Sequence, residues 1–165
     1  MKKLFFTLAF AAMAVVAVNA QPRAIGGNLG ADLGFSYQHG FGEANMLDVA
    51  VALPLHYLEN GFGIGGKVTY NWIDPFGTSV PWTNKGKWHW YMGVGGGLAT
   101  WGFKEDTWWS VGAVGQVGIE YDFWFPLQLS LDWRPQFGYN SSCDKYNYFD
   151  IWGLAGISLG VRYRF

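Results

Sequence analysis

The residue types that most often carry chemistry are few in this 165-residue chain and lie far apart. The three histidines, His39, His56 and His89, fall on different segments without the short spacings of a metal site. The motifs G-x-S-x-G, G-x-x-x-x-G-K-[ST] and H-E-x-x-H do not occur. The glycine-rich stretch 93–97 resembles a phosphate loop only superficially, because it lies in a strand-like pattern with no helix after it. We therefore expect no catalytic residues, no metal ion and no cofactor.

The composition differs from that of an ordinary soluble domain. Charged residues make up 14% of the chain, whereas about 25% is usual in soluble proteins, and aromatic residues reach 19%. So few charges could not cover the surface of a small soluble domain, so we expect apolar surroundings. Without Lys2 and Lys3, nine basic residues stand against twelve acidic ones, which argues against a nucleic-acid partner. The single cysteine, Cys143, cannot form an internal disulfide, and its role stays open.

Residues 1–20 have the pattern of a secretory signal peptide. A basic pair at 2–3 precedes an apolar run at 4–18, and small residues lead to a cleavage site after Ala20. The apolar run is short for a membrane-spanning helix, which needs roughly 20 residues. We therefore expect export, followed by folding of residues 21–165 as one domain.

The elements that must position any functional residue are strands, because apolar and polar residues alternate with a period of two. From Phe125 to Phe137 the apolar residues occupy the odd positions. This run is longer than the 5–6 residues usual for soluble strands, and it is long enough to cross a bilayer at a tilt. The same alternation recurs in six further runs, within 32–38, 47–57, 62–72, 88–98, 109–121 and 151–165.

The breaks between the runs predict the topology. They fall at 39–44, 59–61, 73–86, 102–106, 122–126 and 138–148. Bacterial single-chain membrane barrels have an even number of strands. The glycine-rich segment 23–38 therefore divides into a hairpin near Gly30, and we expect one closed antiparallel β-barrel of about eight strands. With both termini in the periplasm, 122–126 lies in the periplasm and 138–148 outside. The segment 73–86 is long for a periplasmic turn, so its side stays open.

Alternation alone does not distinguish a membrane barrel from a soluble barrel with an apolar core. The polar face decides, because it is mostly Gly, Ser, Ala, Thr and Gln, whereas soluble surfaces are about 25–35% charged. Small side chains suit the crowded lumen of an eight-stranded barrel. Its ions balance four against four, and an unpaired buried charge costs several kcal/mol. We predict a paired lumenal network of Asp32, Asp48, Glu120 and Asp132 with Lys67, Arg134, Arg162 and Arg164.

Aromatic residues gather near the ends of the runs, as in the two girdles of membrane barrels. The topology places one girdle at the periplasmic rim: Trp72, Trp88, Trp90, Tyr121, Phe123, Trp124, Tyr163 and Phe165. It places the other at the external rim: Trp101, Trp108, Trp109, Trp133, Phe137 and Tyr139.

The last residues carry a family resemblance. The ending Gly-Val-Arg-Tyr-Arg-Phe, with Tyr163 third from last and Phe165 last, resembles the C-terminal signature of outer-membrane β-barrel proteins. The segments 118–123 and 126–135 look like small outer-membrane barrels of Bacteroidetes. The resemblance implies a Gram-negative outer membrane, an OmpX-like or OmpA-like barrel, lipid and lipopolysaccharide around it, and a barrel-assembly machinery that reads Tyr163 and Phe165.

Three function classes follow. A structural or surface-interaction role with a plugged lumen is favoured by elimination, and only 138–148 is a large external segment; no external ligand is indicated. A narrow or gated small-solute channel is the alternative, because inward glycines could leave space. A lipid-modifying enzyme is less expected, since the His-x-Ser pair of PagL-type lipid A deacylases is absent.

Overall fold

The protein is described here by a computed structural model, which covers residues 21–30, 32–54, 61–75, 85–103, 106–142, 147–152 and 156–165. Its strands are β1 (Gln21–Gly30), β2 (Asp32–Phe41), β3 (Asn45–Pro54), β4 (Gly61–Ile73), β5 (Gly86–Phe103), β6 (Asp106–Phe123), β7 (Leu127–Trp133), β8 (Gln136–Ser142), β9 (Asn147–Trp152) and β10 (Ile157–Arg164). The expected signal peptide and Cys143 lie outside these residues. Within them, no helix is long and apolar enough to cross a membrane.

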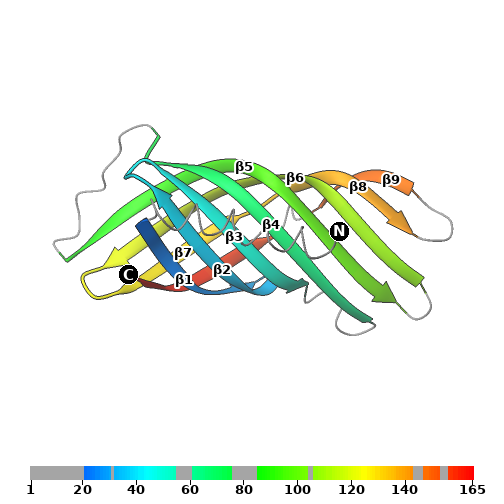
Figure 1. Ribbon diagram of the computed structural model, residues 1–165, viewed down its shortest axis with the longest axis horizontal. Coiled ribbons are helices and arrows are strands. Elements are labelled where there is room, and N and C mark those ends of the chain that lie inside the picture. Colours follow the sequence, from blue (N-terminus) through cyan, green and yellow to red (C-terminus); the bar gives the residue numbers. More distant parts are fainter. Residues whose placement is uncertain are drawn as a thin grey trace, which may run out of the picture.

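The ten strands occupy eight positions in the wall of a closed barrel (Figure 1). β6 pairs with both β7 and β8, which are separated only by Arg134 and Pro135. β10 pairs with β7 and β9 pairs with β8, so β9 and β10 also share one wall position. Antiparallel pairing of β1 with β10 closes the sheet. The expected closed antiparallel barrel of eight strands is confirmed.

The register of the strands fixes their stagger. One row of inward-facing partners starts on β5 at His89 and returns to β5 at Ala99, ten residues further along. The row passes through Glu120, Ser130, Gly160, Asn28, Gly34, Ala52 and Gly65. A stagger of this kind requires strands inclined to the barrel axis, typically by about 35–45°. β5 and β6 are longer than β2 and β3, so that β5, β6 and the attached β8 and β9 extend beyond β2 and β3 at one end (Figure 1).

The turns agree in part with the sequence. The hairpin expected near Gly30 is present, and the φ of 149° at Gly30 is one that favours glycine. The expected break at 138–148 is wrong over most of its length, because β8 reaches Ser142 and β9 begins at Asn147. Pairing with β6 and with each other supplies the backbone hydrogen bonds that this polar segment would otherwise lack. β2 likewise continues to Phe41, which shortens the expected break at 39–44.

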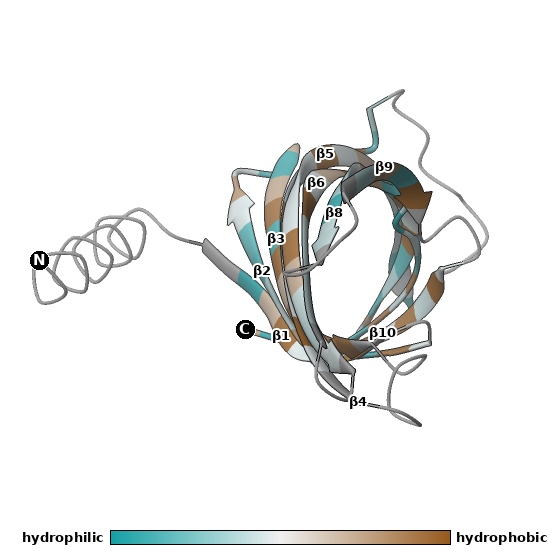
Figure 2. Cartoon of the chain, turned by 90° about the vertical axis from the view of Figure 1, so that its right-hand side faces the viewer, coloured by the Kyte–Doolittle hydropathy of each residue, from teal (hydrophilic) through white to brown (hydrophobic). Residues whose placement is uncertain are grey.

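Side-chain burial is inverted relative to a soluble protein. Among the described residues, eighteen buried side chains are polar or charged and only seven are apolar. Large apolar side chains are instead exposed on the outer wall, for example Leu98 at 68% and Leu159 at 45%. Figure 2, which looks into the barrel, shows the hydropathy alternating along the strands. The apolar face therefore points outward and the polar face lines the lumen, as the sequence predicts.

Candidate functional site

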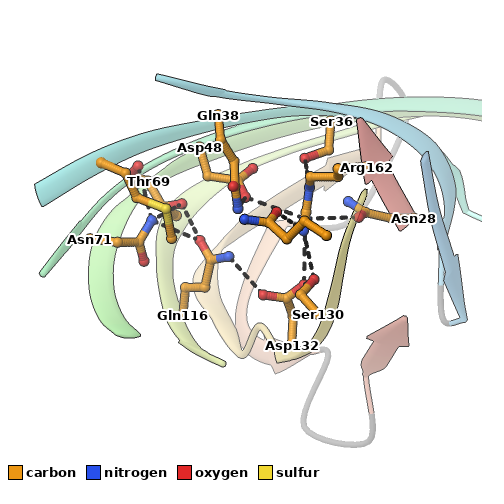
Figure 3. A network of polar contacts seen from close by, with 12 residues as sticks. Asn28, Ser36, Gln38, Asp48, Thr69, Asn71, Gln116, Ser130, Asp132 and Arg162 are labelled. Atoms are coloured by element: carbon orange, nitrogen blue, oxygen red, sulfur yellow. Dashed lines mark hydrogen bonds and ion pairs between the residues drawn. The ribbon is translucent and has the colours of Figure 1, made fainter. Parts of the chain in front are cut away.

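Arg162 of β10 lies in the centre of the lumen, and its side chain is fully buried. Its guanidinium donates hydrogen bonds to Ser36 Oγ at 2.9 Å, Ser130 Oγ at 2.6 Å, Asn28 Oδ1 at 3.1 Å and Gln128 Oε1 at 3.5 Å. Its Nη2 also lies 3.6 Å from a carboxylate oxygen of Asp48 and 3.6 Å from one of Asp132. One side chain therefore connects β10 to β1, β2, β3 and β7 (Figure 3).

A second arginine joins the same two carboxylates. Arg134 Nη2 lies 3.2 Å from Asp48 Oδ2 and 3.5 Å from Asp132 Oδ2. Two buried cations thus face two buried anions, and the four formal charges cancel. Charge-assisted hydrogen bonds of this kind are stronger than neutral ones, and removing one partner would leave a buried charge uncompensated.

Asp132 also accepts hydrogen bonds from neutral donors. Tyr91 Oη, Gln116 Nε2 at 3.1 Å and Ser130 Oγ at 3.0 Å all donate to its carboxylate. Gln116 in turn accepts from Thr69 Oγ1 and from Asn71 Nδ2, the latter at 3.2 Å. These contacts bring β4, β5 and β6 into the network.

The buried polar network around these four charges has a member on each of the eight wall positions. Its members are Asn28, Ser36, Gln38, Asp48, Thr69, Asn71, Tyr91, Gln116, Gln128, Ser130, Asp132, Arg134 and Arg162. We call this set the lumenal network. It crosses the barrel from wall to wall, and it consists of side chains that are themselves buried.

Further ion pairs lie toward the end of the barrel that holds Gln21 and Phe165. Arg23 pairs with Glu120. Arg164 Nη2 lies 3.3 Å from Asp122 Oδ2, and Gln128 Nε2 donates to the other oxygen of Asp122 at 3.1 Å.

His89 and Asp74 form a pair at the same end of the barrel. His89 Nδ1 lies 2.6 Å from Asp74 Oδ2, and Asp74 Oδ1 accepts a hydrogen bond from the backbone of Trp90 at 3.1 Å. Among the described residues, no group of His, Cys, Asp and Glu is arranged to hold a metal ion.

Of the eight ions that the sequence places in the lumen, the structure brings Asp48, Asp132, Arg134 and Arg162 into one cluster. Glu120 and Arg164 have other partners, Arg23 and Asp122, which the sequence reasoning did not include. Lys67 is on the inner face, where its cross-strand partners are Ala50 and Gly97. The side chain of Asp32 is outside the described ones.

Local backbone geometry explains the two omissions. The pairing of β1 with β2 shifts between Pro22 and Ala24, so strict alternation misassigns the face of Arg23. Asp122 falls in the expected break 122–126, yet β6 continues to Phe123 and keeps Asp122 in phase with Glu120. The sequence offers one indication of these two ion pairs, which is that a buried charge needs a partner of opposite sign.

No protein-family model, curated protein or solved structure matches this chain. The closed barrel of eight strands is consistent with a small OmpX-like barrel. The comparisons assign neither that family nor Bacteroidetes.

Many of the expected girdle aromatics lie on the outer wall and contact each other. At one end, Trp88 meets Tyr121 at 4.8 Å between ring centroids, and Tyr163 meets Phe165 at 6.2 Å. Nearby on the wall, Trp72 packs on Tyr70 at 5.5 Å. Trp109 packs on Tyr139 at 5.8 Å between ring centroids. Trp124 is exposed in the turn after β6.

Two pairs of tryptophans lie elsewhere than the expected girdles. Trp90 and Trp133 line one shallow apolar pocket of about 340 Å³ on the outer wall. The prediction that they belong to opposite girdles is therefore wrong, because the stagger of the strands brings them to the same height. Trp101 and Trp108 were expected in the external girdle, and that prediction is wrong. They are cross-strand partners in phase with the inward-facing residues Tyr91 and Ser110. Their place at a strand end suggested a girdle, but alternation along β5 and β6 puts them on the inner face.

Proposed function

We propose that this chain is an integral outer-membrane β-barrel with a structural or surface-interaction role and with a lumen closed by the lumenal network. The main support for this proposal is that polar side chains are buried and apolar ones are exposed. Exposed apolar side chains such as Phe35, Leu98, Leu131 and Leu159 cover the outer wall. Each Å² of such surface costs about 25 cal/mol in water, and lipid removes that cost.

The backbone arrangement supports the same environment. In the hydrocarbon core of a membrane, each backbone N–H and C=O must find a partner within the protein, which a closed barrel provides. Here the pairing of β1 with β10 leaves no open edge along the part of the wall that they share. No further element is therefore needed to shield the backbone where β1 and β10 meet.

The lumenal network supports a closed interior. An eight-stranded barrel is only wide enough for its own side chains, and here buried polar groups from all eight wall positions meet across it. A permeating ion would have to separate Arg134 and Arg162 from Asp48 and Asp132. The alternative of a narrow channel is not favoured by the inward glycines of β5, because a Cβ at Gly93 or Gly95 would overlap atoms of the neighbouring β4.

Assembly and location complete the proposal. Tyr163 and Phe165 are more than half exposed on the outer wall at the C-terminus, where the barrel-assembly machinery could contact them. Outer-membrane lipid and lipopolysaccharide would then surround the barrel. The proposed role is non-catalytic, and release of fatty acids on incubation with lipopolysaccharide would contradict that part.

The membrane location predicts heat-modifiable migration. In a detergent gel, an unboiled sample should run differently from a boiled one, because the closed barrel resists unfolding until it is heated. Fractionation should recover the chain in the outer membrane, and proteolysis of intact cells should cut only the loops at the end opposite Phe165. Equal migration together with recovery from the soluble periplasm would overturn the proposal in favour of a soluble barrel.

The closed lumen predicts that the barrel conducts no ions. In planar bilayers the purified barrel should give no steady single-channel steps, because the lumenal network spans the interior. A general porin from the same membrane, reconstituted in parallel, shows that the recording detects open barrels. Steady steps from this chain would replace the plugged barrel by the channel alternative and would leave the membrane location intact.

A further inference from the structure

One side of the barrel is taller than the other at the end opposite Phe165. β5 and β6 are 18 residues long, whereas β2 and β3 have 10. β8 pairs with the far half of β6, and β9 pairs with β8, so four strands continue past the shorter wall (Figure 1). The inner face of this raised sheet is a continuation of the lumen wall, and Figure 2 views the barrel from this end.

Three aromatic rings gather on that inner face. Trp101 and Trp108 are cross-strand partners, with ring planes 2° apart and centroids 6.5 Å apart. Tyr148 of β9 meets Trp108 edge to face, with centroids 6.5 Å apart. The neighbouring Trp109 points to the opposite face, where it packs on Tyr139. The rings of Trp101, Trp108 and Tyr148 are therefore not part of the apolar outer wall.

On the same face, polar residues and glycines follow the two tryptophans in the direction of the lumen. Ser110, Asn140 and Tyr148 form one cross-strand row, and the next row toward the lumen is Gly112, Gly138 and Asp150. A Cβ at Gly112 or Gly138 would overlap backbone atoms of the paired strand, so β6 and β8 approach each other closely here. Among the described side chains, this row has two charges, Asp150 and, on the adjoining strand β4, Lys67, which is the cross-strand partner of Gly97. The face therefore combines flat rings with the exposed carboxylate of Asp150, while Ser110 and Asn140 are buried.

We propose that this face binds a neutral oligosaccharide from the surrounding medium, with Trp101, Trp108 and Tyr148 stacking on pyranose rings. Pyranoses present flat C–H faces that pack on aromatic rings, and their hydroxyl groups donate hydrogen bonds to the exposed carboxylate of Asp150. An anionic ligand is not favoured, because the described charges of this row, those of Lys67 and Asp150, cancel. Lipopolysaccharide surrounds the outer wall and would approach from the side of Trp109 instead. The inference rests on the proposed function, which places the raised sheet outside the cell.

Isothermal titration of the full chain in detergent micelles tests the proposal, with maltoheptaose, cellohexaose and xylohexaose as separate probes. We expect at least one probe to bind and Trp108→Ala to weaken that binding by at least about tenfold, because a stacked ring is lost. Trp109→Ala is the matched control, since it removes the same ring one residue away on the opposite face. It should change the affinity less than about twofold.

The gel shift on boiling separates this proposal from the proposed function. All variants should keep it, so a loss of sugar binding with the shift intact reports on the site alone. If Trp108→Ala loses the shift, Tyr148→Ala takes its place, because Tyr148 is 45% exposed and tolerates truncation. Absence of binding for all three sugars, or equal weakening by Trp109→Ala, overturns the sugar site while the barrel assignment stands.

Discussion

Arg162→Ala lowers the free energy of unfolding of the barrel by about 3–5 kcal/mol, the range found when one partner of a buried ion pair is removed. The substitution deletes the donors to Ser36, Ser130 and Asn28. It also leaves the buried carboxylates of Asp48 and Asp132 with Arg134 as their only arginine within 4 Å. Urea titration of barrels reconstituted in lipid, followed by the gel shift on boiling, measures the change.

Arg164→Ala is the matched control, because it removes the same side chain two residues away on the same strand. Arg164 is 37% exposed and its ion pair is with Asp122 at 3.3 Å. Water screens the guanidinium, and the buried Asp122 keeps its hydrogen bond from Gln128, so we expect a smaller loss, of about 1 kcal/mol. Equal losses for the two variants would contradict a central role for Arg162 and would indicate that the lumen is hydrated throughout.

Gly95→Ala destabilises the barrel by about 3 kcal/mol, or prevents it from folding, because the added methyl group has no room. A Cβ at this position would overlap the carbonyl oxygen of Val68 and lie 2.7 Å from the Cα of Thr69. Both are backbone atoms of the neighbouring β4, which can move only if the strands separate. The folded fraction on an unboiled gel, together with the urea midpoint, reports the effect.

Gly66→Ala provides the comparison for this prediction. Gly66 lies on β4 in the same part of the wall, but a Cβ there would meet no atom within 4 Å. The stability should change by no more than about 0.5 kcal/mol, as for an ordinary surface substitution. If Gly66→Ala destabilises the barrel as much as Gly95→Ala does, close strand approach is not the reason for glycine at position 95.

The fold could be predicted well from the sequence, because the strands of a barrel follow a local rule, the alternation of apolar and polar residues. Alternation assigned Asp132, Arg134 and Arg162 to one face, and the structure shows all three buried in the lumen. It failed where the backbone departs from the rule, as in the shift between Pro22 and Ala24 that turns Arg23 toward Glu120.

The partners within the lumen could not be predicted from the sequence. Ser36 and Arg162 are 126 positions apart in the chain and meet only because of the stagger between strands. No single segment contains the information on that stagger, since it accumulates around the whole barrel. The raised sheet was missed for a related reason. The polar residues of 138–148 look like a loop, and only their pairing with β6 extends them into strands.

The position of Arg162 near the C-terminus has a consequence for the order of folding. Asn28, Ser36 and Asp48 belong to the first three strands, whereas both arginines that neutralise Asp48 come after residue 133. A partly built barrel therefore has Arg134 but lacks the second counter-charge of Asp48 and Asp132 until the final strand brings Arg162. Closure of the barrel and completion of the charge balance take place in the same event. Intermediates that lack the last strand are disfavoured in a hydrocarbon environment, and the completed barrel reopens only at the cost of exposing the same carboxylates again.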